Sequence, residues 1–332
     1  MTLSISTGRP AAAAPPEIAD WVREVAGRQD PRVGATTPVV PLLTYGLPTR
    51  PFAANASDVY ICAGVALKLH PPLTDPDELA TRLKAIADPD VERSWVQPLG
   101  YRPFPAPGGR VATLWPRVSV LGTLDPPPWQ DAGRLLARVH TLEPKDPLPA
   151  AGTVRLIERA LTRLRGRRDE PGARWLTEGD GDMSEHSRGL DRPGLATLAG
   201  VGERLVARLA EPARSTMVHG DFHLGQLGHT LLRRQWRLLD VDNAGLGDPA
   251  WDLATPAAFY AAGLLDSAAW KTFLGSYREA GGPAVPADGD VWAALELPTR
   301  AAALVAAVAM LGRVHAEATA DSLLAVTFTG ER

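Results

Sequence analysis

Two short segments of the sequence contain the side chains best suited to chemistry. Residues 219–226 read His-Gly-Asp-Phe-His-Leu-Gly-Gln, and residues 238–242 read Leu-Leu-Asp-Val-Asp. Together they supply the carboxylates of Asp221 and Asp240 and the amide of Gln226. A carboxylate can orient a hydroxyl and accept its proton, while a second carboxylate and an amide oxygen can hold Mg²⁺. This set of side chains is what transfer of a phosphoryl group to a hydroxyl requires.

The spacing within the first segment assigns roles to these side chains. An amide follows Asp221 by five residues, which is the spacing of a kinase catalytic loop, Asp-x-x-x-x-Asn, with Gln226 in place of Asn. We predict Asp221 as the base, and Asp240 and Gln226 as the ligands of Mg²⁺. Asp242 is an alternative further ligand, because on a strand it would face the same side as Asp240.

Other histidines and acids near the two segments have structural interpretations. His219 and His223 have the spacing of metal ligands on a helix, but on a loop we expect them to brace it by hydrogen bonds. Asp248 and Asp252 flank the start of an apolar run, where carboxylates cap the N–H groups of a helix. His140 ends an apolar helical stripe, and we predict that it is packed rather than catalytic.

The pattern between residues 36 and 120 predicts a small lobe built on an antiparallel sheet. Short apolar and alternating runs, broken by Pro and Gly, predict strands over Val39–Leu43, Val59–Cys62, Val65–Leu69 and Val111–Leu114. One helix interrupts these strands near Thr74, where a capping residue precedes an early proline. An amphipathic helix over 17–27 lies in the lead-in, residues 1–35.

The pattern over residues 121–332 predicts a larger, mainly helical lobe. Helical periodicity occupies 129–142, 154–164, 195–209, 252–265, 267–280 and 290–316. A strand is expected at Met217–Val218, and a hairpin of Leu231–Leu232 and Trp236–Val241 would deliver Asp240. Residues 166–193 are charged and rich in Gly and Arg, which predicts a surface loop or a poorly ordered insertion.

Composition narrows the classes of partner. The 35 basic and 38 acidic residues leave a formal charge of −3, which offers no general attraction for nucleic acid or an anionic membrane. Cys62 is the only cysteine, which excludes an intrachain disulfide and favours a reducing, cytoplasmic setting. The apolar run Ala301–Leu311 is shorter than the roughly 20 residues of a membrane span, and we expect a buried helix there. A small-molecule substrate fits this composition best.

Three motifs resemble those of the aminoglycoside phosphotransferase and choline kinase superfamily. They are His-Gly-Asp-Phe-His at 219–223, Leu-Asp at 239–240 and Gly-Asp-Pro-Ala-Trp-Asp-Leu-Ala at 247–254. The segment Leu-Leu-Ala-Arg-Val-His at 135–140 is similar to the first large-lobe helix of that family. The resemblance implies a protein-kinase-like, two-lobed α/β (α+β) fold, with ATP bound between the lobes. It covers the chain except for residues 1–35 and 166–193.

The resemblance also assigns individual residues. It implies that Asp221 is the catalytic base, that Asp240 is a metal ligand, and that Gln226 is a second ligand where most members have Asn. Gln occurs there in maltokinase-like and glucosamine-kinase-like members. It further implies that Lys68 positions the phosphates of ATP and pairs with Glu78, or alternatively with Glu92.

Two segments of the small lobe are expected to contact the nucleotide. Residues 53–60 stand where the family has a phosphate-covering loop, and their small side chains would let backbone N–H groups and Ser57 approach phosphate. The hinge is expected near 114–117, whose backbone, including Trp115, would meet the adenine. The sequence favours neither ATP nor GTP and indicates no oligomeric state.

Three functions are consistent with these residues. The first is an ATP-dependent kinase that modifies a hydroxyl of an aminoglycoside or another hydroxylated antibiotic, and so confers antibiotic resistance. The second is a metabolic kinase for a sugar or amino sugar, and the third is a nucleotide-binding pseudokinase. The family places acceptor groups on the large-lobe helices, where we expect Glu296, Arg300, Glu317 and Asp321 as ordinary exposed residues.

Overall fold

The computed structural model describes residues 14–41, 57–121, 125–142, 147–169, 192–209, 215–230, 233–310 and 317–328. The chain divides into two compact units. Unit 1 comprises Met1–Pro128, Asp146–Pro149 and Leu224–Asp242, and unit 2 comprises Trp129–Lys145, Ala150–His223 and Asn243–Arg332. The two units thus interleave along the sequence, whereas the sequence pattern suggested one boundary near residue 120.

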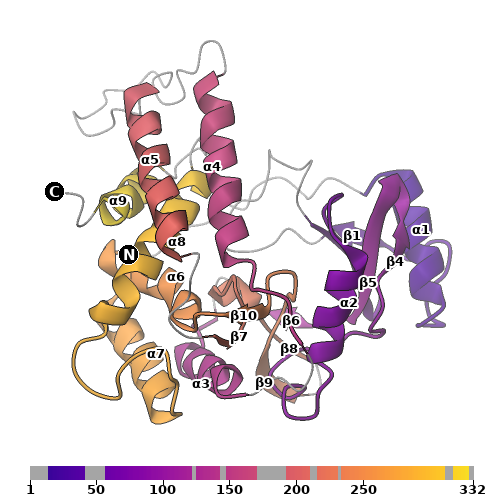
Figure 1. Ribbon diagram of the computed structural model, residues 1–332. Coiled ribbons are helices and arrows are strands. Elements are labelled where there is room, and N and C mark those ends of the chain that lie inside the picture. Colours follow the sequence, from indigo (N-terminus) through magenta and orange to yellow (C-terminus); the bar gives the residue numbers. More distant parts are fainter. Residues whose placement is uncertain are drawn as a thin grey trace. The chain divides into compact units, whose positions relative to one another are not determined.

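Unit 1 is built on a five-stranded antiparallel sheet with the order β1-β2-β3-β5-β4 (Figure 1). The strands are β1 (Val39–Pro41), β2 (Asp58–Cys62), β3 (Val65–Leu69), β4 (Phe104–Ala106) and β5 (Arg110–Pro116). The predicted strands over 59–62, 65–69 and 111–114 are confirmed, and residues 42–43 of the first lie outside the described part. Strand β3 pairs with β2 on one side and β5 on the other, so it is an interior strand of the sheet, and four of its five residues are buried.

Two helices accompany this sheet. Helix α1 (Pro16–Gly27) packs on β2 and β3, where Val22 and Ala26 join the buried side chains of the strands in one hydrophobic core. Helix α2 (Pro76–Ala85) begins at Asp75, whose carboxylate accepts hydrogen bonds from the N–H groups of Asp77 and Glu78. Both helices confirm the sequence predictions, because amphipathic spacing and a side-chain cap are local signals.

A second sheet of unit 1 has the order β6-β8-β9 and is formed by β6 (Ser119–Val120), β8 (Leu227–Thr230) and β9 (Arg233–Leu238). The 3₁₀ turn η3 (Leu224–Gln226) leads directly into β8. The predicted hairpin exists, but its strands begin and end earlier than expected. The predicted first strand, at 231–232, lies outside the described part, and the second strand ends at Leu238 rather than at Val241.

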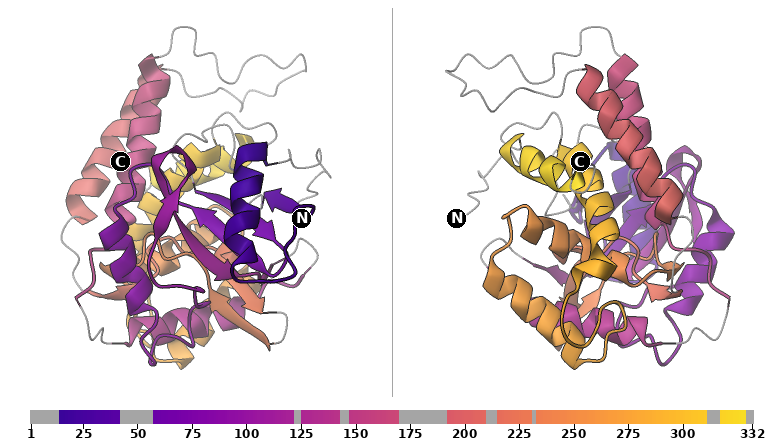
Figure 2. Two further views of the ribbon diagram at one scale, coloured as in Figure 1. Left: turned by 90° about the vertical axis from the view of Figure 1, so that its right-hand side faces the viewer. Right: turned by 60° about the vertical axis from the view of Figure 1, so that its left-hand side comes forward.

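Unit 2 is mainly helical. Its helices are α3 (Trp129–His140), α4 (Thr153–Asp169), α5 (Arg192–Leu209), α6 (Ala250–Ala261), α7 (Ser267–Glu279), α8 (Trp292–Met310) and α9 (Glu317–Thr327). The antiparallel pair β7 (Thr216–Val218) and β10 (Gly245–Gly247) stands among them. Helices α4 and α5 lie side by side in both views of Figure 2 and are joined by residues outside the described part.

Helix α8 is the central helix of unit 2 and packs against α6 and α9. In length and composition it could cross a membrane, yet 67% of its most apolar window is buried within the structure, as is common for a core helix. The prediction of a buried helix over 301–311 is confirmed for the described residues. The prediction that Arg300 is exposed was wrong. Its side chain is buried, and its Nε donates to the carbonyl oxygen of Thr327 at 3.0 Å.

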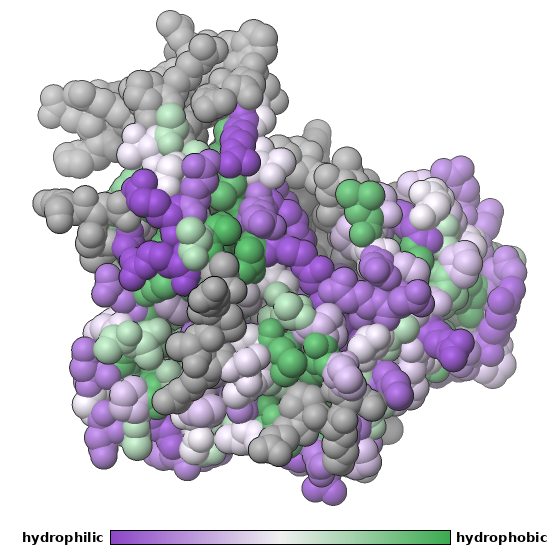
Figure 3. Space-filling view, in the orientation of Figure 1, coloured by the Kyte–Doolittle hydropathy of each residue, from purple (hydrophilic) through white to green (hydrophobic). Residues whose placement is uncertain are grey.

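The exposed large apolar side chains of the described residues are scattered. They are Val40, Leu73, Leu99, Tyr101 and Leu264. On the face shown in Figure 3, hydrophobic areas alternate with hydrophilic ones. Single exposed apolar residues are ordinary on globular surfaces and indicate no docking site.

Helix α3 packs so closely on α7 that one position requires glycine. A Cβ on Gly133 would lie 2.2 Å from the Ser276 Oγ and 2.4 Å from the Phe273 carbonyl oxygen. We expect Gly133→Ala to lower the free energy of unfolding by about 1–3 kcal/mol, the usual effect of overpacking. Gly275→Ala is the matched control, since a Cβ on Gly275 meets no atom within 4 Å. Urea titration of both variants tests this, and equal stabilities would contradict it.

Candidate functional site

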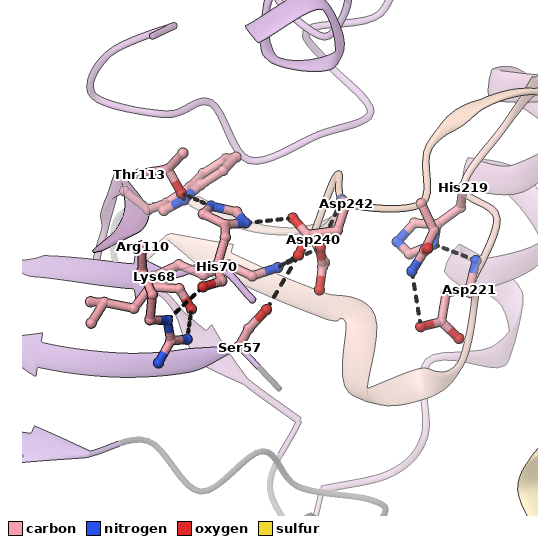
Figure 4. A network of polar contacts seen from close by, with 12 residues as sticks. Ser57, Lys68, His70, Arg110, Thr113, His219, Asp221, Asp240 and Asp242 are labelled. Atoms are coloured by element: carbon pink, nitrogen blue, oxygen red, sulfur yellow. Dashed lines mark hydrogen bonds and ion pairs between the residues drawn. The ribbon is translucent and has the colours of Figure 1, made fainter. Parts of the chain in front are cut away.

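The first cluster of the site lies in unit 1 and is centred on Lys68 (Figure 4). This residue of β3 is 7% exposed. Its Nζ is 2.6 Å from the Asp240 Oδ1 and 2.9 Å from the Asp242 Oδ2. Burial alone would lower the pKa of Lys68, but the two carboxylates outweigh it and raise the pKa to about 12. The ammonium is therefore charged throughout the physiological pH range.

Asp242 belongs to a chain of polar contacts that reaches β5. Its Oδ1 is 3.0 Å from the Nδ1 of His70, whose Nε2 is 2.8 Å from the Thr113 hydroxyl. The indole N–H of Trp115 donates to the same hydroxyl at 2.8 Å. Although burial opposes ionisation, Lys68 and His70 hold the pKa of Asp242 well below its ordinary value. Asp242 is thus an ionised carboxylate held in one orientation.

Asp240 has an unusual backbone conformation. Its φ is +60°, in the left-handed region that costs a non-glycine residue roughly 1–2 kcal/mol. Its Oδ1 accepts a hydrogen bond from the N–H of Asp242 at 2.9 Å, so the backbone turns between the two residues. Strand alternation, which predicted that both carboxylates face one side, does not apply after Leu238. The turn brings both to Lys68 instead, and strain of this kind is concentrated at functional sites.

The β8–β9 hairpin places Gln226 near Asp240. The N–H of Leu239 donates to the Gln226 carbonyl oxygen at 2.8 Å, and Leu227 pairs with Leu238 in the ladder. The side chain of Gln226 is buried and makes no hydrogen bond within the described part of the chain. The Oδ2 of Asp240 likewise has no protein donor among those residues. Two oxygen ligands of the kind that Mg²⁺ prefers are therefore available in one region of unit 1.

Two residues predicted to take part in nucleotide binding have other partners. The carboxylate of Glu78 accepts a hydrogen bond from Arg82, one turn further along α2, so the expected Lys68–Glu78 ion pair is not formed and Asp240 and Asp242 replace it. The hydroxyl of Ser57, predicted to donate to phosphate, donates to the Asp242 Oδ2 at 3.3 Å. Residues 53–56 of that loop lie outside the described part. The predicted hinge at 114–117 coincides with the end of β5.

The second cluster lies in unit 2 and contains Asp221. Its loop follows β7, and Gly220 takes a φ of +80° at the turn. The N–H of Asp221 donates to the Nδ1 of His219 at 3.3 Å, which confirms that His219 braces this loop (Figure 4). The Oδ2 of Asp221 accepts a hydrogen bond from the Asn243 side-chain amide at 3.4 Å. The half-buried carboxylate is thus fixed from its backbone and from its side chain.

Asp252 anchors the backbone of the same loop. It is fully buried, and its two oxygens accept hydrogen bonds from the N–H groups of His219 at 2.6 Å and Gly220 at 2.8 Å. The indole N–H of Trp251 donates to the Gly220 carbonyl oxygen at 2.9 Å. Asp252 was predicted to cap the backbone N–H groups at the start of a helix. It does bind backbone N–H groups, but they belong to the loop of Asp221. The predicted cap of the α6 start is Asp248, which accepts from the N–H of Ala250.

His140 of α3 connects Asp252 to Tyr277 of α7. Its Nε2 is 3.0 Å from the Asp252 Oδ2, and its Nδ1 is 2.8 Å from the Tyr277 hydroxyl. The side chain is buried, which confirms the prediction of a packed histidine. Although burial of Asp252 opposes ionisation, its hydrogen bond with His140 and the charge interactions with His140 and His219 lower its pKa. The loop that presents Asp221 thus rests on an ionised, fully buried carboxylate.

Sequence reasoning missed His70 and Asn243. His70 stands two residues after Lys68, so continued alternation along β3 would have placed both on one face. Asn243 directly follows Asp242 and lies in no periodic pattern, and its contact with Asp221 spans 22 residues. The sequence contains no local signal for that contact.

Comparisons with known proteins agree with this geometry. The model of the phosphotransferase enzyme family matches residues 128–298, more than half of the 332 residues. Similar solved structures include a choline/ethanolamine kinase family protein from Mesorhizobium loti, with 15% identity, a TM-score of 0.56 and coverage of 95% of this chain and 96% of that one. A search of curated protein sequences gave no significant match.

Two further solved structures share the fold. A spectinomycin phosphotransferase has 12% identity and a TM-score of 0.51, with coverage of 89% of this chain and 93% of that one. An ethanolamine kinase from Plasmodium vivax has 11% identity and a TM-score of 0.51, with coverage of 88% and 82%. The predicted kinase-like fold, an antiparallel five-stranded sheet followed by a mainly helical region, is confirmed. With its two clusters of acidic residues and a family match over more than half its length, this chain belongs to the phosphotransferase enzyme family.

Proposed function

We propose that this phosphotransferase transfers the γ-phosphoryl group of ATP, with Mg²⁺, to a hydroxyl of an aminoglycoside or another hydroxylated antibiotic. The observation that carries the proposal is the buried ammonium of Lys68 between the carboxylates of Asp240 and Asp242. A positioned cation beside carboxylate ligands is what binding of nucleotide phosphates with a metal requires. A spectinomycin phosphotransferase of the same fold binds ADP and spectinomycin, which supports both the nucleotide and the acceptor class.

The residues of each unit have separate tasks in this reaction. In unit 1, the free oxygen of Asp240 and the amide oxygen of Gln226 fit Mg²⁺, which when bound supplies charge neutralisation at the phosphates. Lys68 positions the same phosphates by its charge. In unit 2, Asp221 orients the acceptor hydroxyl and takes its proton. Since phosphoryl transfer needs little covalent chemistry from the protein, alignment and charge stabilisation account for catalysis.

A sugar or amino-sugar kinase is the second candidate, and Gln226 favours it. Its side chain is buried, without a hydrogen bond to the described residues, and it stands where Asn is usual in the superfamily that the chain resembles. Maltokinase-like and glucosamine-kinase-like members share this Gln. The longer side chain keeps the amide oxygen as a ligand and shifts it by one methylene.

An acceptor screen with the purified full chain tests both candidates. ATP and MgCl₂ are incubated with aminoglycosides, spectinomycin, macrolides, amino sugars, maltose and choline, and release of ADP is measured for each. Mass spectrometry of the acceptor confirms transfer of the phosphoryl group. We expect acceptor-dependent ADP release with an antibiotic, while turnover with a sugar alone would select the second candidate. Nucleotide binding without turnover on any acceptor would contradict both and indicate a pseudokinase.

Removal of the metal gives a separate prediction. We expect EDTA to abolish transfer and Mg²⁺ to restore it. Gln226→Leu should raise the Mg²⁺ concentration for half-maximal rate about 10- to 100-fold, the usual effect of losing a metal-site partner, whereas Gln226→Asn should retain most of the affinity. Gln235→Leu on β9 is the matched control, because Gln235 is exposed. Equal Mg²⁺ dependence of Gln226→Leu and the control would remove Gln226 from the metal site.

A further inference from the structure

Asn243 contacts the proposed base and has no role in the proposed reaction so far. It is 8% exposed and belongs to unit 2, as does Asp221. Its Nδ2 is 3.4 Å from the Asp221 Oδ2, which is long for a hydrogen bond. Catalytic hydrogen bonds are often long outside the reactive complex and shorten within it. The amide is therefore within reach of the carboxylate that must accept the proton.

The partners of Asn243 select one orientation of its amide. Arg159 on α4 has its Nη2 3.5 Å from the Asn243 Oδ1. A guanidinium can only donate, and an ionised carboxylate can only accept. Rotation of the amide by 180° would set its NH₂ group against Arg159 and its oxygen against Asp221. Arg159 thus favours the orientation in which Asn243 donates to Asp221.

Two glycines hold Asn243 in place. A Cβ on Gly152 would lie 2.1 Å from the Asn243 Oδ1, and a Cβ on Gly220 would lie 2.2 Å from its carbonyl oxygen. The N–H of Gly152 also donates to that carbonyl oxygen at 2.9 Å. Because both glycines lie so close, Asn243 has little room to move away from Asp221. Any side chain at residue 152 must displace the side-chain amide of Asn243.

We propose that Asn243 is a positioning residue for Asp221, and that Arg159 fixes the orientation of the Asn243 amide. The proposal rests on the proposed function, in which Asp221 is the base. A hydrogen bond to the Oδ2 restricts rotation of the carboxylate, so Asp221 presents one orientation to the acceptor hydroxyl. Misplacement of a reacting group by about 1 Å can cost about 100-fold in rate. Nucleotide binding, which involves the residues around Lys68, does not depend on this contact.

The isosteric variant Asn243→Asp tests the hydrogen bond without a change in volume. It removes the NH₂ donor and sets a second carboxylate against Asp221. We expect kcat to fall about 10- to 100-fold, with KM for ATP unchanged, for the fastest acceptor of the screen and for hydrolysis of MgATP by water. Thermal melting confirms that the variant is folded. A variant that keeps wild-type kcat would overturn the proposal, because a space-filling role tolerates Asp.

Two matched pairs of variants test the same contact through the residues that surround Asn243. Arg159→Met should lower kcat about 3- to 10-fold, while Arg163→Met, one turn along α4, should leave it unchanged. Gly152→Ala should lower kcat as Asn243→Asp does, while Gly166→Ala, whose Cβ meets no atom within 4 Å, should not. These pairs decide the matter if Asn243→Asp fails to fold, and equal rates within both pairs would overturn the proposal.

Asp221→Asn, assayed beside these variants, separates this inference from the proposed function. An inactive Asp221→Asn with a normal Asn243→Asp would refute the positioning role alone. An active Asp221→Asn would refute Asp221 as the base, and with it the positioning role of Asn243, but not the transfer of a phosphoryl group from ATP.

Discussion

Asp221→Asn is expected to lower kcat by about 10²–10⁴-fold, the range that a general base contributes. The substitution keeps the shape of the side chain and removes the group that accepts the hydroxyl proton. Affinity for ATP should stay within about 3-fold of wild type, because the residues around Lys68 belong to unit 1 and Asp221 to unit 2. Steady-state release of ADP gives kcat, and isothermal titration with ATP gives the affinity.

The control for this loss is Asp131→Asn. Asp131 is an exposed residue of α3, also in unit 2, and the same chemical change there should leave kcat unchanged. If Asp221→Asn and Asp131→Asn turned over at similar rates, the base would have to be sought elsewhere. If Asp221→Asn lost ATP binding as well, its effect would not be specific to proton transfer.

Asp252→Ala is expected to lower the free energy of unfolding by about 3–5 kcal/mol, because it removes a buried carboxylate that accepts hydrogen bonds from several buried groups. It leaves the N–H groups of His219 and Gly220 and the ring of His140 without their acceptor. Urea unfolding measures the loss. Asp266→Ala is the control, because Asp266 caps α7 at an exposed position and its loss should cost only about 1 kcal/mol. Equal losses would show that Asp252 is an ordinary cap.

The contribution of Asp252 should also depend on pH. His140 hydrogen-bonds to the carboxylate, and the charges of His140 and His219 act on it, so its pKa in the folded state lies below its ordinary value. A lowered pKa means that the stabilisation is fully present above the unfolded-state pKa of about 3.9 and is lost as pH falls through the folded-state pKa. The difference in stability between wild type and Asp252→Ala should therefore be constant near neutral pH and decrease below about pH 4. Urea titrations at several pH values test this.

The sequence predicted those parts of the structure that depend on local signals. The amphipathic spacing of α1 and the cap and early proline of α2 are signals within a few residues, and both helices lie where they were expected. The motif around Asp221 and Asp240 likewise combines residues that are close in sequence. In contrast, the apolar run before Asp240 suggested a strand up to Val241, and the left-handed conformation of Asp240 ends it at Leu238. Strand propensity could not reveal that turn.

The contacts that hold the functional side chains were less predictable, because they join distant residues. Lys68 has the partners Asp240 and Asp242, more than 170 residues away, whereas the sequence suggested the nearby Glu78. The contact of Asn243 with Asp221 depends on the close approach of a glycine backbone, at Gly152, that no periodicity describes. A sequence pattern names the residue types that a reaction needs, but tertiary packing selects their partners.

The interleaving of the two units restricts how this enzyme can be recombined with its relatives. The chain enters unit 1 at Leu224 and leaves it again after Asp242, so nineteen residues of unit 1 are inserted within unit 2. A chimaera with one crossover near residue 128 would combine the sheet of one parent with a Lys68-binding segment of another. Swapping acceptor specificity while keeping nucleotide binding intact therefore requires crossovers on both sides of 224–242, so that this segment travels with its own β3.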